Sequence, residues 1–191
     1  MSERIAYFGY GANRDPRMMG WILGQDPDTL TGYLASLDGY GLAIQRLDQV
    51  PDKVVQSAPI PSSARDLLKE NWDEDFMSYV IFPSPGDKVS GVMWELTPED
   101  RERVRDWELI DFGWYEDVEV SVRDSAGDEH TVVTERLGSG QEFAHEVYGT
   151  RYVTWLNDPE KFRVVAEKAA REYDERLGPE GGRPNPDINK A

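Results

Sequence analysis

One carboxylate differs from the other acidic residues of the chain in its surroundings. Glu108 follows Trp107 and precedes a run of large apolar residues, namely Leu109, Ile110, Phe112, Trp114 and Tyr115. A carboxyl group in apolar surroundings is partly desolvated, which raises its pKa above the ordinary value of about 4.3. Such a group can accept and return a proton near neutral pH. Glu108 is therefore a candidate proton shuttle, and an exposed glutamate at a helix end is the plain alternative.

A second candidate feature is the loop Tyr10-Gly11-Ala12-Asn13. The apolar residues 5–10 predict a strand before it, and residues 14–23 predict a short helix after it that ends at Gly24. Backbone N–H groups that gather in front of a helix can hold a carboxylate or an oxyanion. The loop is thus a candidate binding site for a negatively charged group, and an ordinary tight turn is the alternative.

Other kinds of catalytic centre find little support. The chain has no cysteine, which excludes disulfides, thiolate metal sites and a cysteine nucleophile. His130 and His145 lack the paired spacing of a zinc site, so we expect no metal and no cofactor. The glycines at 9 and 11 lack the third glycine of a dinucleotide fingerprint, and Gly138-Ser139-Gly140 lacks the context of a serine nucleophile.

The remaining patterns predict a chain of strands and helices. Alternation of apolar and polar residues predicts strands at 79–82, 89–96, 114–123 and 130–137, and two short strands within 30–45. Residues 83–87 are rich in proline and glycine, so we expect them to join the strands 79–82 and 89–96 as a hairpin, and 125–128 to join the last two strands. Helices are predicted at Pro98–Trp107, with Thr97 as N-cap, and at Pro159–Leu177, while 147–156 is ambiguous.

Residues 47–77 interrupt this alternation. They contain Pro51, Pro59 and Pro61, followed by a charged, partly helical stretch, which is typical of a long surface excursion rather than of core. We interpret them as an insertion that could cover the site as a lid, or simply decorate the surface. The 191 residues suit a single domain, which we place at 1–177, with 178–191 as a flexible tail.

The charge balance narrows the choice of partners. The formal net charge is -16, which would repel nucleic-acid phosphates and anionic lipids, so we expect neither nucleic acid nor membrane as a partner. Residues 1–7 do not have the composition of a signal peptide, and no apolar stretch is long enough to span a membrane. We therefore expect a cytoplasmic protein.

Three blocks of the sequence match the motifs of one family. Tyr7-Phe8-Gly9-Tyr10-Gly11-Ala12-Asn13 is similar to an opening motif Tyr-Phe-x-Tyr-Gly-Ser-Asn, with alanine in place of serine. Ser84-Pro85-Gly86-Asp87 and Gly91-Val92-Met93-Trp94-Glu95-Leu96 match a Pro-Gly turn and a Gly-Val-x-Trp block. Glu108 and Tyr115 stand where the family has a glutamate-bearing turn and a tyrosine that enters the next strand. Over residues 5–175, the chain thus resembles the γ-glutamylcyclotransferase-like family.

The chain departs from the family pattern at several positions. Ala12 lacks the hydroxyl of the usual serine, and Leu109 replaces a common glycine, which implies a different local turn. Thr134-Glu135 occupies the region where many members place a tyrosine. Gly149-Thr150-Arg151-Tyr152 is similar to the family's Pro-Ser-x-x-Tyr segment only in part.

The resemblance implies a fold and an activity. The fold would be α+β, a small mixed β-barrel flanked by helices. The protein would be a monomer or a weak homodimer. The activity would be intramolecular aminolysis of a small γ-glutamyl substrate, which releases 5-oxoproline and an amine or amino acid. A hydrolase of γ-glutamyl amides and a non-catalytic ligand-binding domain of the same fold are the alternatives.

The resemblance also implies roles for single residues. Glu108 would be the catalytic proton shuttle. The loop Tyr10 to Asn13 would hold the substrate, with the backbone N–H groups of Gly11, Ala12 and Asn13 binding a carboxylate or oxyanion. Tyr115 and Tyr152 would orient the substrate.

Overall fold

Five strands of the part of the chain that the structure describes close into a barrel in the order β1-β3-β2-β4-β5. The structure is a computed structural model and describes residues 3–144 and 156–177. The strands are β1 (Ile5–Gly9), β2 (Gly32–Arg46), β3 (Met77–Leu96), β4 (Tyr115–Asp124) and β5 (Glu129–Leu137). Since β1 pairs antiparallel with β3 but parallel with β5, the barrel is mixed, which confirms the expected α+β architecture.

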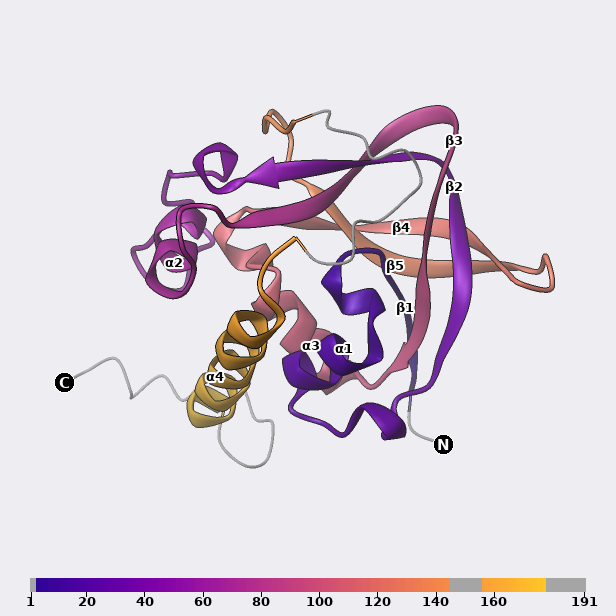
Figure 1. The fold of residues 1–191 in the computed structure, drawn as a ribbon, viewed down its shortest axis with the longest axis horizontal. Coiled ribbons are helices and arrows are strands. Elements are labelled where there is room, and N and C mark those ends of the chain that lie inside the picture. The colour runs from indigo at the N-terminus through magenta and orange to yellow at the C-terminus, as the bar shows by residue number, and fades with distance from the viewer. Residues whose placement is uncertain (1–2, 145–155, 178–191) are drawn as a thin grey trace.

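Strands β2 and β3 are longer than their patterns predicted, and they run alongside each other over most of their length (Figure 1). The predicted hairpin between residues 79–82 and 89–96 is wrong, because both stretches belong to β3 and both pair with β2. Likewise, residues 30–45 contain one strand rather than two. The prolines and glycine of 83–87 do not reverse the chain. They form a bulge opposite Gly39, whose φ of 79° bends β2 at that point.

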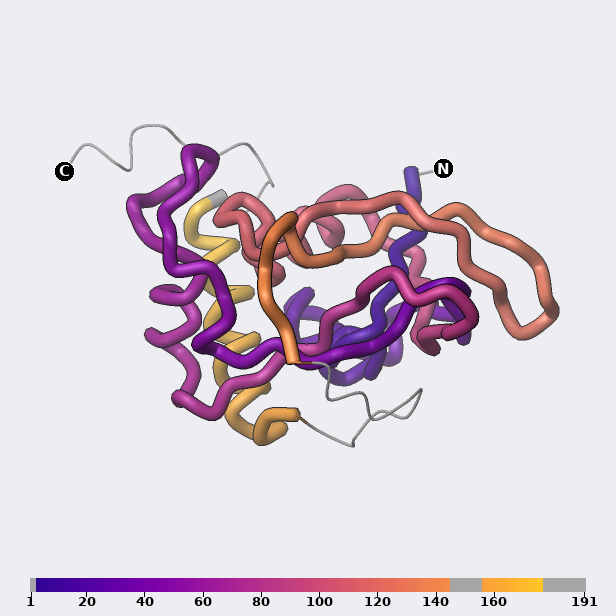
Figure 2. Tube along the Cα trace, turned by 90° about the horizontal axis from the view of Figure 1, so that it is seen from above, coloured from indigo at the N-terminus to yellow at the C-terminus, as the bar shows by residue number. Residues whose placement is uncertain are grey.

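The hairpin of β4 and β5 is confirmed, with residues 125–128 as its turn. Figure 2 shows the tip of this hairpin extending beyond the rest of the molecule. Its other end, where β4 begins and β5 finishes, lies on the side of the barrel that carries the helices (Figure 1).

The helices of the described residues are α1 (Pro16–Leu23), α2 (Ala64–Asn71), α3 (Pro98–Trp107) and α4 (Pro159–Leu177). Short 3₁₀ helices are η1 (Ala12–Arg14), η2 (Pro27–Thr29), η3 (Leu47–Gln49) and η4 (Ile110–Phe112). Thr97 and Asp100 cap α3 reciprocally, each side chain accepting a hydrogen bond from the backbone N–H of the other, so the predicted helix start is confirmed. No helix in residues 3–144 or 156–177 is both long and apolar enough to cross a membrane.

Two hydrophobic clusters are divided by the sheet. Neighbouring residues alternate between them, as side chains of a strand point to opposite faces. Phe8, Ile44 and Ile81 belong to the cluster formed mainly by strand residues, whereas Tyr7 and Val80 pack with the helices. Helices α1, α3 and α4 lie together against the face of the sheet that carries Tyr7 and Val80 (Figure 1). The barrel wall is therefore buried on both sides where the helices cover it.

The expectation that residues 47–77 form a surface excursion rather than core is wrong for their apolar side chains. Val50, Ala64, Leu68, Trp72 and Phe76 are buried in the cluster shared by the barrel and the helices. The polar composition of the segment concealed these anchors, because they stand singly among charged residues. The segment thus forms part of the core, with Ser63 as the N-cap of α2.

A pair of substitutions in α2 tests this structural role. Leu68→Ala leaves a cavity in the core and should lower the free energy of unfolding by about 2–5 kcal/mol. Lys69→Ala, at the exposed neighbouring position, should change it by no more than about 0.5 kcal/mol. Chemical denaturation of both variants provides the measurement. Equal stabilities would show that the segment is surface decoration after all.

Candidate active site

A cavity of about 1040 Å³ lies beside the C-terminal end of α3. The loop after β1, the turn after α3, the segment 47–77 and α4 all contribute to its wall. Among the described residues, it brings together six of the seven predicted site residues, which are Tyr10, Gly11, Ala12, Asn13, Glu108 and Tyr115. The seventh, Tyr152, lies outside the described residues.

Glu108 is the C-cap of α3, and its backbone N–H donates to the carbonyl of Val104. The next residue, Leu109, has φ of 50°, a left-handed conformation that costs a non-glycine residue about 1–2 kcal/mol. Leu109 therefore adopts a backbone conformation that glycine adopts more easily. The turn leads directly into η4 and leaves Glu108 half-buried at the cavity wall.

Asn13 connects the β1 loop to this carboxyl. Its Oδ1 accepts a hydrogen bond from the backbone N–H of Gly11 at 3.1 Å. Its Nδ2 donates to Oε1 of Glu108 at 3.1 Å and to the hydroxyl of Tyr7 at 2.6 Å. Its backbone carbonyl accepts from the indole Nε1 of Trp94 at 2.9 Å. Asn13 is thus fixed on both its side chain and its main chain.

The position of Asn13 also depends on a glycine in β1. A Cβ at Gly9 would lie 2.9 Å from both the backbone O and the Oδ1 of Asn13, too close for any side chain. The loop can therefore fold back over the end of β1 only because residue 9 is glycine.

The Gly11 N–H already has a partner within the loop. It donates to Asn13 Oδ1 and so orients the asparagine. The backbone N–H groups of Ala12 and Asn13 have no hydrogen-bond acceptor within residues 3–144 and 156–177. Both residues line the cavity, and neither backbone donor depends on the serine-to-alanine change at position 12.

The hydroxyl groups of Tyr10 and Tyr115 are engaged with the protein. Tyr115 donates to the backbone carbonyl of Tyr79 at 3.0 Å and lies 3.1 Å from Oγ of Ser78. Tyr10 donates to the backbone carbonyl of Glu135 at 3.0 Å. Both rings are almost fully buried, so these tyrosines shape the cavity wall.

Three charged or polar side chains of the site were not among the predicted site residues. Glu135 of β5 and Arg101 of α3 form a buried ion pair, 2.9 Å between Oε1 and Nη1. Tyr7 donates to Oε2 of Glu135 at 2.8 Å, and the guanidinium of Arg101 lies 4.9 Å from the centre of the Tyr7 ring. The one signal in the sequence was that Thr134-Glu135 occupies the region where the family places a tyrosine.

The surroundings raise the pKa values of both carboxyl groups. Burial raises the pKa of Glu108 well above its usual range, the negative charge of Glu135 raises it further, and Arg101 and the Asn13 hydrogen bond oppose the increase. Burial also raises the pKa of Glu135, against the stronger opposition of Arg101 and of the Tyr7 hydroxyl. The surroundings therefore differ between the two carboxyls: the Arg101 guanidinium and the Tyr7 hydroxyl favour the charged form of Glu135, whereas Glu108 has the Asn13 amide as its only hydrogen-bond donor among the described residues.

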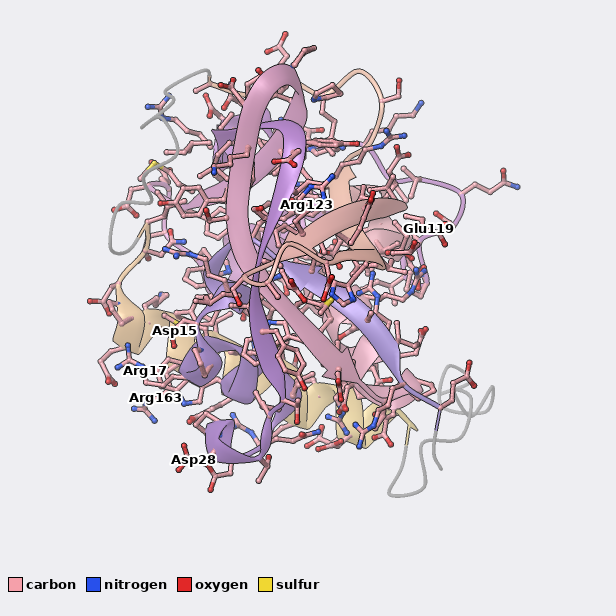
Figure 3. The ribbon with its side chains drawn as sticks, turned by 90° about the vertical axis from the view of Figure 1, so that its right-hand side faces the viewer. Asp15, Arg17, Asp28, Glu119, Arg123 and Arg163 are labelled. Carbon is pink, nitrogen blue, oxygen red and sulfur yellow. The ribbon has the colours of Figure 1, made fainter. Side chains whose placement is uncertain are left out.

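Charged residues also line the cavity. Asp15 and Arg17 form an ion pair of 3.3 Å at the start of α1, and Figure 3 shows them together at the surface. Elsewhere in the lining, Nζ of Lys168 in α4 donates to Oδ1 of Asn71 in α2 at 2.7 Å. The apolar part of the lining includes Trp72, Phe76, Trp107, Phe112 and Phe162.

Comparison with known proteins identifies the fold. No protein-family model and no curated protein sequence matches the chain. A solved structure of a γ-glutamyl cyclotransferase is similar to it, with a TM-score of 0.57 and 21% identity over 99% of this chain and 94% of that one. An uncharacterised human protein has a TM-score of 0.55 and 21% identity, over 97% of this chain and 91% of that one.

A third similar structure is YkqA from Bacillus subtilis, with a TM-score of 0.52 and 16% identity over 94% of this chain and 51% of that one. The structural similarity establishes the fold, and sequence identities this low leave the activity open. The resemblance seen in the motifs is thereby confirmed at the level of architecture: the chain has the γ-glutamylcyclotransferase-like fold.

Proposed function

We propose that the protein is an enzyme of the γ-glutamylcyclotransferase type. It would convert a γ-glutamyl amide into 5-oxoproline and release an amine or amino acid. The observation that carries this proposal is the Glu108 carboxyl, which lines a large cavity, is held by Asn13 of the β1 loop and has a raised pKa. The glutamate and the loop that the sequence motifs singled out are thus in direct contact.

The proposed reaction needs only the substrate and one proton shuttle. The α-amino nitrogen of the γ-glutamyl group attacks its own side-chain carbonyl carbon, and the amide C–N bond to the leaving group breaks. Because the attack closes a ring, a cavity that holds the substrate folded supplies much of the acceleration. The ionised Glu108 takes the proton that the attacking nitrogen loses and returns it to the leaving nitrogen.

The loop donors suit the negative charges of this substrate. The N–H groups of Ala12 and Asn13 would bind the α-carboxylate or the oxyanion that forms on the attacked carbonyl. Both lie in the loop that also contains the Asn13 side chain, so the groups that bind charge and the group that moves the proton share one support. The apolar wall of Trp72, Trp107 and Phe162 would then face the leaving group.

Replacing the shuttle tests the proposal. In Glu108→Gln, the amide oxygen can still accept the Asn13 hydrogen bond, so the fold should persist, while kcat for 5-oxoproline release should fall at least about a hundredfold. The control is Glu102→Gln on the same helix, whose side chain is 63% exposed. The measurement is 5-oxoproline release across a panel of γ-glutamyl amino acids, peptides and amines. A folded Glu108→Gln variant with full activity would refute the assignment.

The raised pKa of Glu108 also predicts how stability depends on pH. The Glu108 carboxyl keeps its proton to higher pH in the folded protein than in the unfolded chain. Its contribution to the free energy of unfolding is therefore complete below the unfolded pKa of about 4.3 and is lost as the pH rises through the folded pKa. Glu108→Gln has no such loss. Its stability relative to the wild type should therefore increase from acid toward neutral pH in denaturation experiments, and a constant difference would contradict the desolvation of Glu108.

A further inference from the structure

Four side chains form a continuous line of hydrogen bonds that ends at Glu108. Glu135 accepts from Tyr7, Tyr7 accepts from Asn13, and Asn13 also donates to Glu108, with donor–acceptor distances of 2.8, 2.6 and 3.1 Å. Arg101 lies at the far end, paired with Glu135. Tyr7 and Glu135 are almost completely buried, so the line runs through the interior.

The direction of each bond follows from the asparagine. Since Oδ1 of Asn13 accepts the Gly11 N–H, the amide nitrogen must point the other way, toward Tyr7 and Glu108. Both of its hydrogens are then used. The Tyr7 oxygen receives one of them, so the single hydrogen of its hydroxyl is directed to Glu135.

The opposite end of the line imposes the same direction. Glu135 can accept from Tyr7 with full strength when it is a carboxylate, and the Arg101 guanidinium at its other oxygen favours that state. Arg101 is held in turn by Asp117 of β4, 2.5 Å from Nη2 to Oδ1. A buried ion pair of this kind is poor support for stability, because apolar replacements often stabilise a protein as well or better.

We propose that Arg101 and Glu135 are a positioning pair that supports, from the far end, the hydrogen-bond direction set by Gly11 and Asn13 and that places a negative charge near Glu108, so that Oε1 accepts from Asn13 and Oε2 carries the transferred proton. Oε2 has no hydrogen-bond partner in the described part of the chain, and Glu108 lines the cavity. The catalytic part of this inference rests on the proposed function. The arrangement itself does not.

Several ionisable groups lie close enough to the carboxyls of Glu108 and Glu135 to affect their titration or to be affected by it. Glu108 is influenced by Glu135 from β5 and by Arg101 from its own helix, and it influences Tyr7 of β1 and Tyr115 of β4. Burial and the two glutamates raise the pKa of both tyrosine hydroxyls well above the usual range, so they stay neutral and act as hydrogen-bond donors. Asp117 is shared between Arg101 and Arg105. Beyond the effect of burial, the charge that most affects the pKa of Glu108 is therefore that of Glu135, and the charge of Arg101 opposes it.

Two variants of almost unchanged volume separate the charge of the pair from its packing. Glu135→Gln removes the negative charge, so the Glu108 carboxyl should titrate at lower pH than in the wild type. Tyr7→Phe breaks the same line of hydrogen bonds but leaves the Arg101–Glu135 ion pair in place, so Glu108 should titrate closer to its wild-type pH than it does in Glu135→Gln. Each variant should lower kcat by about tenfold, which corresponds to about 1.4 kcal/mol, with a smaller effect on KM.

The titration of Glu108 is followed directly by NMR with glutamate labelled at the side-chain carboxyl carbon, and its resonance is identified by its loss in Glu108→Gln. Glu129→Gln is the matched control, because it removes the same charge from an exposed position of the same strand. A loosened interior would move the titration in Tyr7→Phe as much as in Glu135→Gln. That result, or an unchanged titration in Glu135→Gln, would overturn the proposal.

The NMR readout does not depend on turnover. If the expected titration shifts appear in a protein that releases no 5-oxoproline, the positioning pair is supported and the proposed function fails. If 5-oxoproline is released but the titrations of the variants coincide, the function is supported and the positioning pair fails. If Glu135→Gln does not fold, Glu135→Asp provides a second variant, because it keeps the negative charge but its side chain is one methylene shorter. A wild-type titration of Glu108 combined with full kcat in Glu135→Asp would equally overturn the positioning role.

Discussion

The side chain of Asn13 is the contact on which the site depends. It joins the loop after β1 to the end of α3, two segments separated by 95 residues, and it does so with a hydrogen bond to the carboxyl that would move the proton. Its amide is oriented by Gly11 and its main chain is held by Trp94. Gly11, Trp94 and Glu108 each belong to one of the three sequence motifs, so these contacts explain why the three motifs occur together in one chain.

The barrel supplies the rigid frame for that contact. β1 lies between β3 and β5, so Trp94 and Glu135, one from each neighbouring strand, reach the same loop from either side. Tyr7 projects from β1 toward the helices, where the Arg101 guanidinium lies over its ring. Since sites built on strands and helices are held more precisely than sites on loops alone, the carboxyl of Glu108 is well placed for chemistry that tolerates little displacement.

Local signals predicted much of this arrangement. The start of α3 followed from Thr97 and Pro98, and the predicted bounds Pro98–Trp107 placed Glu108 directly after its last residue. The importance of Glu135 could not be read in the same way. Alternation along β5 shows which residues share a face, but the partners on that face, Arg101 and Tyr7, are chosen by barrel closure. The apolar anchors of residues 47–77 were hidden for a related reason, because single buried side chains in a polar segment leave no periodic signal.

The proposed site closes a ring instead of adding water. Incubating the protein with γ-glutamyl substrates in water enriched in ¹⁸O, and identifying the products by mass spectrometry, distinguishes the two reactions. Intramolecular aminolysis uses no water, so we expect 5-oxoproline free of the label. Glutamate carrying ¹⁸O would show a hydrolase, substrates left intact across the panel would show a binding protein, and either result would refute ring closure at this site.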